Sequence, residues 1–130
     1  MNLVDSSGWL EYFADAPNAD FFAVPIEDVN HLIVPTLCIS EVFKRIYQQR
    51  GENSALQAVA LMNQGQMIDL DVSIALNAAK LGLDFKLPLA DSIILATARA
   101  KNAVIWTQDS DFKGIENVKY IPSKKDRLRK

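Results

Sequence analysis

The chain has 130 residues, of which 49% are hydrophobic and 23% are charged, so it is long enough for one domain with a real core. No apolar run is long enough to cross a bilayer, and the first residues, MNLVDSSGW, lack the basic and hydrophobic regions of a secretion signal, so a cytoplasmic location is expected. The single cysteine excludes an internal disulfide, and the single histidine excludes a multi-histidine zinc site.

The net charge of −2 is unevenly distributed along the chain. Residues 123–130 contain five basic residues and one acidic residue, so their charge of +4 leaves −6 on residues 1–122. We therefore predict one domain over residues 1–122 and a basic C-terminal tail over residues 123–130. The tail can contact phosphate groups, or it can be a solvated disordered segment, and the sequence leaves both possibilities open.

A short apolar strand over residues 2–4 opens the chain and ends at Asp5. Ser6 and Ser7 are natural N-cap residues for a helix that reaches about Phe13. Two interpretations of Asp5 remain open. It is either a simple helix cap or a functional carboxylate at the carboxyl end of a strand.

A short helix over residues 20–28 precedes a predicted strand over residues 31–34, which would bury His31. Thr36 can cap the next helix, which runs to about Gln49. Its apolar stripe consists of Ile39, Val42, Phe43, Ile46 and Tyr47. Glu41 lies opposite that stripe, so it either faces solvent or overhangs the carboxyl edge of the sheet from the first turns of the helix.

Ser54 and Gln57 form a capping-box pattern for a helix that reaches about Asn63. A short strand is predicted over residues 67–70. Asp71 can then cap another helix. The apolar stripe of that helix consists of Val72, Ala75, Leu76, Ala79 and Leu83.

Pro88 precedes a helix over residues 90–100 that is apolar on almost all sides, so this helix should be central. Short strands are predicted over residues 103–106 and 118–121. Because strands alternate with helices along the whole chain, the sequence predicts an α/β fold with a short, mostly parallel central sheet and helices on both faces.

Four acidic residues are placed where they can meet at one edge of that sheet. Asp5 and Asp109 follow predicted strands, and the carboxyl ends of parallel strands are where ligands bind. Glu41 and Asp91 lie in the early turns of helices that approach the same edge. Four converging acids would repel one another without a cation, and oxygen ligands select Mg²⁺ or Mn²⁺. The sequence therefore predicts a carboxylate site for a divalent metal ion.

Three further residues stand beside these acids. Ser7 and Thr107 are candidates to orient a carboxylate or a metal-bound water through hydrogen bonds. Asp111 is either a fifth acid of the site or a cap for the short turn that follows it. The sequence does not decide between these two roles.

The sequence lacks the residue patterns that other kinds of catalytic site require. Cys38 has no histidine near it in sequence and is expected to be a half-buried packing residue rather than a nucleophile. His31, alone in a predicted strand, is expected to be structural. No glycine-rich segment matches a dinucleotide or nucleotide phosphate loop, and Ser7 and Thr107 lack the surroundings of a serine-hydrolase elbow.

Four motifs, in order along the chain, resemble those of the PIN-domain nucleases and, more closely, of the VapC toxins of bacterial toxin–antitoxin pairs: LVDSSGWLEYF, PTLCISEV, LPLADSIILATA and WTQDSDF. The resemblance covers nearly the whole chain and places the acidic quartet of the family on Asp5, Glu41, Asp91 and Asp109. Ser6 departs slightly from the pattern, since many members have threonine there.

The resemblance implies a PIN-like three-layer fold and a Mg²⁺- or Mn²⁺-dependent endoribonuclease. It also implies a homodimer and a cognate antitoxin that binds near the cleft and inhibits the enzyme. Asp5, Asp91 and Asp109 would hold the metal, with Glu41 as a further ligand or as the residue that positions water. Asp111 matches an acid that some members use and others do not.

Several alternatives remain. Lys44, Arg45 and the tail would hold the RNA backbone, or they simply form solvated surface. A receiver-type domain would need a lysine directly after a late strand, and neither Lys113 nor Lys119 stands there. The complete acidic quartet argues against a PIN-like RNA-binding or assembly module without activity, and the short chain argues against a nuclease that grips branched DNA.

Overall fold

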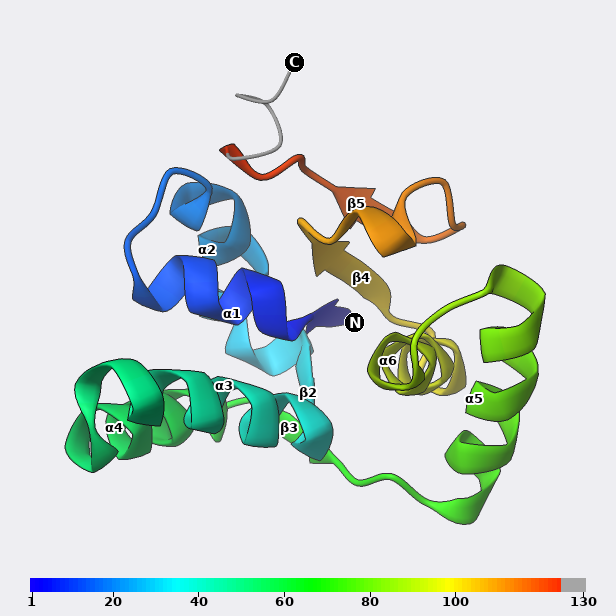
Figure 1. Cartoon of the computed structure of the whole chain (residues 1–130), viewed down its shortest axis with the longest axis horizontal. Coiled ribbons are helices and arrows are strands. Elements are labelled where there is room, and N and C mark those ends of the chain that lie inside the picture. Colours follow the sequence, from blue (N-terminus) through cyan, green and yellow to red (C-terminus); the bar gives the residue numbers. More distant parts are fainter. Residues whose placement is uncertain (125–130) are drawn as a thin grey trace.

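A parallel sheet of five strands forms the centre of the protein in the computed structural model, which describes residues 1–124 (Figure 1). The strands are β1 (Asn2–Val4), β2 (Leu32–Pro35), β3 (Gln66–Ile68), β4 (Val104–Thr107) and β5 (Val118–Tyr120). They lie in the order β3-β2-β1-β4-β5, and each neighbouring pair is parallel. The predicted strands are therefore confirmed, with bounds that shift by no more than two residues.

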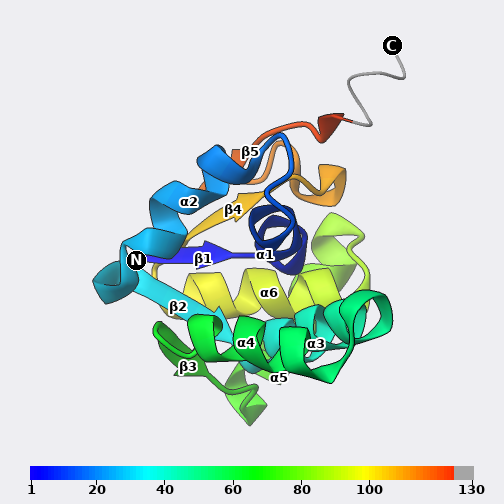
Figure 2. The same ribbon diagram turned by 90° about the vertical axis from the view of Figure 1, so that its left-hand side faces the viewer.

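Helices cover both faces of the sheet. They are α1 (Ser6–Phe13), α2 (Ala19–Glu27), α3 (Thr36–Arg50), α4 (Glu52–Met62), α5 (Val72–Phe85) and α6 (Leu89–Ala100), with short 3-10 helices η1 (Val29–His31) and η2 (Ser110–Phe112). Figure 1 shows α1 to α4 on one side of the sheet and α5 and α6 on the other, and Figure 2 looks onto the first side. This arrangement confirms the predicted three layers. No helix within residues 1–124 is long and apolar enough to cross a membrane.

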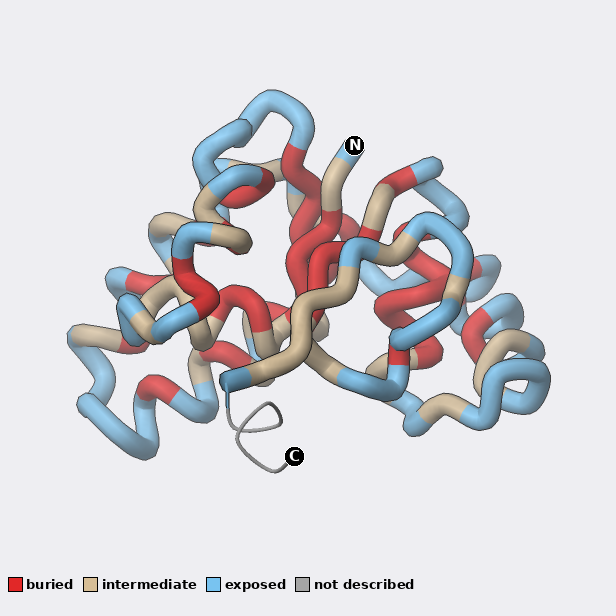
Figure 3. The backbone as a smooth tube through the Cα atoms, turned by 90° about the horizontal axis from the view of Figure 1, so that it is seen from above, coloured by how far each residue is buried: buried red, intermediate tan, exposed pale blue. Residues whose placement is uncertain are grey.

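The core lies where the central strands meet the helices. Leu3, Ile33 and Ile105, from three adjacent strands, are almost completely buried, as expected for a parallel sheet that is covered on both faces. Residues 92–98 of α6 are buried without interruption, which confirms the prediction that this helix is central. Figure 3 shows the buried residues gathered in the middle of the molecule and the exposed ones at its margins.

The predicted position of His31 is wrong. It lies in η1, just before β2, and its side chain is exposed. Its Nδ1 atom lies 3.0 Å from Oδ1 of Asp28, three residues earlier. Because β2 begins at Leu32 rather than at His31, the histidine stays in the preceding turn instead of pointing into the core.

The predicted apolar stripe of α3 is partly wrong. Val42 and Ile46 are buried as predicted, but Tyr47 is exposed. Cys38 is completely buried, where partial burial was predicted. Residues 38, 42 and 46 are four apart and share one helix face, so the face that meets the core is rotated toward the cysteine.

The capping box predicted at Ser54 and Gln57 is also wrong. Helix α4 begins at Glu52, and its N-cap is Gly51, which has a φ of 85° and supplies no side-chain cap. A positive φ of this kind is readily adopted only by glycine, so Gly51 allows the tight break between α3 and α4. The cap predicted for the next helix is confirmed, because Asp71 accepts a hydrogen bond of 2.8 Å from the backbone N–H of Ile74.

The α5 stripe, which we define as Val72, Ala75, Leu76, Ala79 and Leu83, does not face the core. An apolar stripe usually packs against the rest of the domain. Here α5 buries Ile74 and Ala78 instead, and the α5 stripe is exposed to solvent.

Close packing around Gly8 leads to a first prediction. A Cβ atom at this position would lie 2.6 Å from the ring of Phe22 and 2.7 Å from Cγ1 of Val4, and both of those side chains are completely buried. The Gly8→Ala variant should therefore lose about 1–3 kcal/mol of unfolding free energy through overpacking, as measured by urea denaturation. The exposed control Ser73→Ala should change it by less than about 0.5 kcal/mol, and an equally small change for Gly8→Ala would contradict the packing described.

Candidate metal centre

The site lies where the strand order reverses. Strand β1 has β2 on one side and β4 on the other. The chain builds the sheet from β1 through β2 to β3 in one direction, and then adds β4 and β5 on the opposite side of β1. In open α/β sheets, ligands bind outside the carboxyl ends of the strands at such a point. Val4 at the end of β1 is in register with Trp106 in β4. Asp5 and the loop that carries Asp109 therefore leave the same edge of the sheet side by side.

Asp5 is buried and fully engaged by neighbouring groups. Its Oδ1 accepts hydrogen bonds from Ser7 Oγ at 2.7 Å and from the backbone N–H of Gly8 at 3.1 Å. Its Oδ2 accepts a hydrogen bond of 2.7 Å from Thr107 Oγ1. Asp5 therefore caps α1 and also lies at the carboxyl end of a strand, and its functional role stays a prediction. Ser7 and Thr107 orient a carboxylate, as predicted.

Burial raises the pKa of Asp5 to about 6, although the hydrogen bonds from Thr107, Ser7 and Gly8 act in the opposite direction. The negative charge of Asp109 raises it further. The carboxylate of Asp5 thus sits in a place where its charge is costly unless a cation is near.

Three other carboxylates gather next to Asp5. Asp91 from the first turn of α6, Asp109 after β4 and Asp111 in η2 each offer an oxygen atom, and these oxygens lie within 4.8 Å of one another. Asp91 and Asp109 are half-buried, and Asp111 is exposed. We call this set the acidic cluster. It joins two acids of the predicted quartet with Asp111.

The two possible roles of Asp111 are now separated. The cap of η2 is Asp109, whose Oδ1 accepts a hydrogen bond of 2.9 Å from the backbone N–H of Asp111. The carboxyl group of Asp111 lies instead within 4.8 Å of carboxylate oxygens of Asp91 and Asp109. Asp111 therefore stands in the acidic cluster and does not cap the turn.

Crowding of like charges changes the ionisation of the acidic cluster. The pKa of Asp91 rises to about 7, first because of burial, then because of the charge of Asp109 and the hydrogen bond and charge of Asp111. The charge of Asp5 adds to the effect, so Asp5 and the acidic cluster share one electrostatic environment. At neutral pH without a cation, Asp91 holds a proton part of the time.

Glu41 reaches this edge of the sheet from α3. It is half-buried, and its Oε1 accepts a hydrogen bond of 2.7 Å from Ser6 Oγ. Since Ser6 directly follows Asp5, this bond ties Glu41 to the neighbourhood of the buried carboxylate. Glu41 is thus held on the sheet edge and is not simply solvated, although its oxygens are not among those of the acidic cluster.

Cys38 is completely buried, close enough to Asp5 and Glu41 to feel their charges. Burial raises the pKa of its thiol far above the usual range, and the charges of the two acids raise it further. A thiol in such surroundings stays protonated, which agrees with the predicted packing role.

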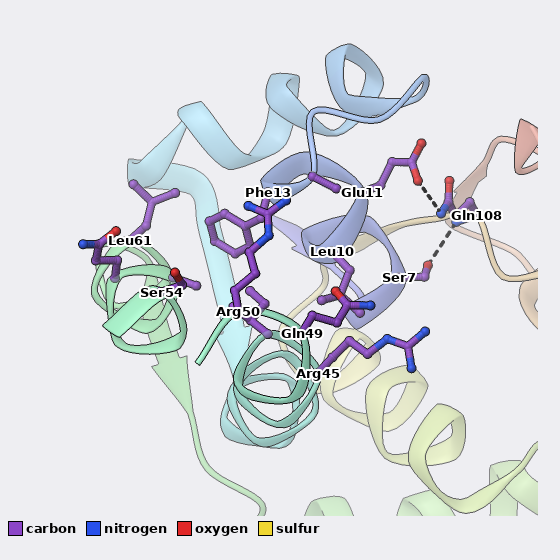
Figure 4. A pocket seen from close by; sticks show the side chains of 14 residues that line it. Ser7, Leu10, Glu11, Phe13, Arg45, Gln49, Arg50, Ser54, Leu61 and Gln108 are labelled. Carbon is purple, nitrogen blue, oxygen red and sulfur yellow. Dashed lines mark hydrogen bonds between the residues drawn. The ribbon is translucent and has the colours of Figure 1, made fainter. Parts of the chain in front are cut away.

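Two features of the site were missed by sequence reasoning. Ser6 was recognised only as a helix cap, and nothing in its spacing showed that it would bond to Glu41, 35 residues away. Glu11, Asn18 and Gln108 form the second feature. Glu11 accepts a hydrogen bond of 3.1 Å from Gln108 Nε2 (Figure 4) and one of 2.8 Å from the backbone N–H of Asn18. Asn18 Nδ2 donates to Gln108 Oε1 at 3.0 Å. This network fastens the residue before Asp109 onto α1.

The donor atoms fit a small divalent cation. Mg²⁺ prefers oxygen ligands at about 2.0–2.1 Å, so two oxygens on opposite sides of the ion are about 4.2 Å apart. The oxygens of Asp91, Asp109 and Asp111 lie within 4.8 Å of one another, which is close to this spacing. The raised pKa of Asp91 indicates the same need for positive charge.

A groove of about 650 Å³ opens beside the site, between α1, α3 and α4 (Figure 4). Ser7 and Gln108 lie at its end nearest the acids. Its lining combines apolar and polar side chains: Leu10, Glu11, Phe13, Ala14, Arg45, Ile46, Gln49, Arg50, Ser54, Gln57, Ala58 and Leu61. Of the two predicted RNA-binding residues, Arg45 lines the groove, whereas Lys44 is exposed on α3 and is not part of the lining.

The fold and the site together define a class of protein, a three-layer α/β domain with carboxylates gathered at the switch point of a parallel sheet. The chain belongs to the PIN-domain family, whose sequence pattern matches residues 3–118. No curated protein sequence matches the chain.

Solved structures share the fold over almost the whole chain. A toxin–antitoxin complex from Klebsiella pneumoniae has a TM-score of 0.78 and 23% identity, with 92% of this chain and 96% of that one covered. The Mycobacterium tuberculosis toxin VapC20, described as cleaving the sarcin–ricin loop, has a TM-score of 0.74 and 14% identity, with 89% and 95% covered. VapBC2 from Rickettsia felis, bound to a promoter DNA fragment, has a TM-score of 0.73 and 14% identity, with 93% and 97% covered. The PIN-like fold is therefore confirmed.

Proposed function

We propose that this protein is a metal-dependent endoribonuclease that acts as the toxin of a toxin–antitoxin pair. The observation that carries the proposal is the acidic cluster beside the buried Asp5, at the sheet edge where an α/β domain binds its ligands. Membership of the PIN-domain family supports nuclease chemistry, and the similar structures of toxins and toxin–antitoxin complexes support the biological role.

In this proposal Asp5, Asp91 and Asp109 hold Mg²⁺ or Mn²⁺, and Asp111 stands beside them as a further carboxylate. The ion would lower the pKa of water and offset the negative charge that develops on the RNA phosphate. The protein contributes the arrangement of the acids. Ser7 and Thr107 fix both oxygens of Asp5 by hydrogen bonds of 2.7 Å, so that the carboxylate does not have to reorganise during the reaction.

Glu41 would accept a hydrogen bond from the attacking water and orient it toward the phosphorus atom, or serve as a further ligand. Its free oxygen is available because Ser6 occupies only Oε1. Lys44 and Arg45 are exposed on the same helix and would hold the RNA backbone by their charges.

The hydrogen bond from Ser6 to Glu41 leads to a prediction about how Glu41 is positioned for catalysis. The Ser6→Ala variant loses the hydroxyl that fixes Glu41, so kcat for RNA cleavage should fall about 10-fold, equivalent to about 1.4 kcal/mol, with little change in KM. Ser6→Thr keeps a hydroxyl and should retain most of the activity. Equal activity of the alanine and parent proteins would show that the bond to Glu41 does not serve catalysis.

The proposed partners are an RNA substrate, a cognate antitoxin and a second copy of the chain, all in the cytoplasm. The groove of about 650 Å³ is our proposed contact for the antitoxin, because α3 and α4 both line it and it ends beside the acids. Arg45 and Arg50 form no ion pair with another residue of the described part of the chain, so both are free to meet acidic groups of a partner. A segment lying there would block access to the site.

The activity can be tested directly with purified protein. Structured RNAs and DNAs of the same sequences would be incubated with the parent, Asp5→Asn and Asp109→Asn proteins, with Mg²⁺, with Mn²⁺ and with a chelator, and the cut positions would be mapped. Metal-dependent cutting of RNA by the parent, lost in both folded variants, is the expected result. Metal binding without cutting of any RNA would favour a PIN module that binds or assembles without activity. Growth arrest on expression would then distinguish a missing target from that module.

A further inference from the structure

Gln108 lies between the two carboxylates of the site that follow strands. Along the chain it stands directly before Asp109, just after the end of β4. Its backbone N–H donates to Ser7 Oγ over 3.5 Å, and the same hydroxyl donates to Asp5 Oδ1 over 2.7 Å. The residue before Asp109 is therefore bonded to a group that also orients Asp5.

The side-chain amide of Gln108 is bonded at both ends. Its Nε2 donates to Glu11 Oε1 at 3.1 Å, and its Oε1 accepts from Asn18 Nδ2 at 3.0 Å. The second oxygen of Glu11 accepts from the backbone N–H of Asn18 at 2.8 Å, so the three residues form a closed ring of hydrogen bonds. We call it the Gln108 ring. Figure 4 shows Glu11 on α1 reaching toward Gln108. Because a carboxylate only accepts hydrogen bonds, Glu11 holds the amide in one orientation.

Asn18 serves this ring in place of its own helix. It is 3% exposed and stands at the N-cap of α2, where an asparagine side chain usually accepts a hydrogen bond from the first turn. Its side chain makes no such cap bond. Its Nδ2 donates to Gln108 and, at 3.1 Å, to the carbonyl oxygen of Pro122 after β5. The Gln108 ring is therefore held from α1, from the start of α2 and from the segment after β5.

The Gln108 ring ties the loop of Asp109 to other parts of the fold. The N–H of Asp109 donates to Thr107 Oγ1, and its Oδ1 accepts from the N–H of Asp111, both at 2.9 Å. Both partners lie within two residues of Asp109, so these two bonds shape the loop itself. After the end of β4, the side chain of Gln108 bonds the loop to α1 and to the start of α2.

We propose that Gln108 is a positioning residue of the site, which holds the carboxylate of Asp109 at the spacing from Asp91 and Asp111 that a cation requires. Its effect on RNA cleavage rests on the proposed function, whereas the positioning itself does not. Only an amide suits this place. Glutamate would set a second carboxylate against Glu11, and methionine would have a similar length without the hydrogen bonds. A misplacement of about 1 Å can cost a reaction about 100-fold in rate.

Exchanging the two bonded side chains gives the sharpest variant. In the double variant Glu11→Gln, Gln108→Glu, the amide at position 11 can donate to the carboxylate at position 108 and accept from the N–H of Asn18. The new carboxylate can still accept from Asn18 Nδ2, so every bond of the ring can form again. Gln108→Met and Gln108→Glu each break the ring. The control Asp71→Ala removes a hydrogen bond of 2.8 Å at the start of α5.

The exchange of the Asp111 amide proton with water, measured by NMR without metal, reports whether Asp109 keeps its place. That N–H donates to Asp109 Oδ1, so it exchanges faster when the carboxylate moves away. Exchange should be about 10-fold faster in Gln108→Met and Gln108→Glu than in the parent. In the double variant and in Asp71→Ala it should stay within about 2-fold of the parent.

Mn²⁺ binding by calorimetry and RNA cleavage would be measured on the same samples. In both single variants the Mn²⁺ dissociation constant should rise about 10-fold and kcat should fall about 10-fold with little change in KM, and the double variant should recover to within about 3-fold. Single variants that match the parent in exchange and Mn²⁺ affinity, or a double variant that does not recover, would overturn the inference. So would a parent that binds no Mn²⁺. A parent with the expected exchange and Mn²⁺ binding that cuts no RNA would support the positioning and contradict the proposed function alone.

Discussion

The Asp91→Asn variant should lose at least about 100-fold in RNA cleavage and at the same time become more stable without metal at pH 8. The loss follows from removing a charged ligand from the acidic cluster. The gain follows because burial, together with Asp109 and Asp111, raises the pKa of Asp91 to about 7 in the folded protein from 3.8 in the unfolded chain, so its charge at pH 8 disfavours folding. Since Asp91 is only half-buried, the gain should be about 1–2 kcal/mol after solvent screening.

The gain should depend on pH in a defined way. Below about pH 4 Asp91 is protonated in both the folded and the unfolded chain, so its charge no longer affects folding. The unfolding free energies of the parent and Asp91→Asn proteins should therefore differ little at that pH. The exposed Asp84→Asn on α5 is the control and should change neither activity nor the pH trend. Asp91→Asn with full activity would remove this residue from the proposed site.

The second large effect concerns the parent protein. Asp5 and Asp91 have folded pKa values raised to about 6 and about 7, so their stabilising contribution is present below about pH 4 and is lost as the pH rises through those values. The metal-free protein should therefore unfold more easily at pH 8 than at pH 5, as measured by urea denaturation. Saturating Mg²⁺ should reverse the trend, because the ion binds the deprotonated carboxylates and stabilises the folded state.

A control separates this effect from other titrating groups. The double variant Asp5→Asn, Asp91→Asn should have a nearly flat pH dependence between pH 5 and pH 8 and should gain little from Mg²⁺. A parent protein that is equally stable at both pH values, or a double variant that keeps the Mg²⁺ effect, would show that these carboxylates do not form the cation site.

Local sequence signals predicted the central parts of the fold well. Helix α6 is apolar on almost every side, and a helix with no polar face can only be covered, so its central place followed from composition alone. Asp5 and Asp109 could be placed at one edge because both follow short apolar strands, and parallel strands end at the same edge.

Other features depended on information that a pattern does not contain. Periodicity shows which residues share a face of α5, but it does not show whether that face meets the core or another molecule, and here it meets neither within the described chain. His31 was misplaced because a strand that begins one residue later leaves the histidine in a turn.

In the site, too, local patterns predicted some features and missed others. The acids could be chosen from their positions, but the bonds that hold them join distant residues: Ser6 with Glu41, and Asn18 with Gln108. The sequence left two roles open for Asp111 because its backbone and its side chain have different partners. Its N–H donates to Asp109, whereas its carboxyl group acts on Asp91, and the sequence alone does not reveal these partners.

In our proposal the carboxylates at this sheet edge hold a divalent cation. The most direct test is an anomalous-scattering map from crystals of the parent protein grown with Mn²⁺, compared with crystals of Asp109→Asn. We expect a peak bounded by Asp91 and Asp109 in the parent and no peak there in the variant. An ion bound elsewhere, or none at all at saturating Mn²⁺ in a protein that still cleaves RNA, would contradict it.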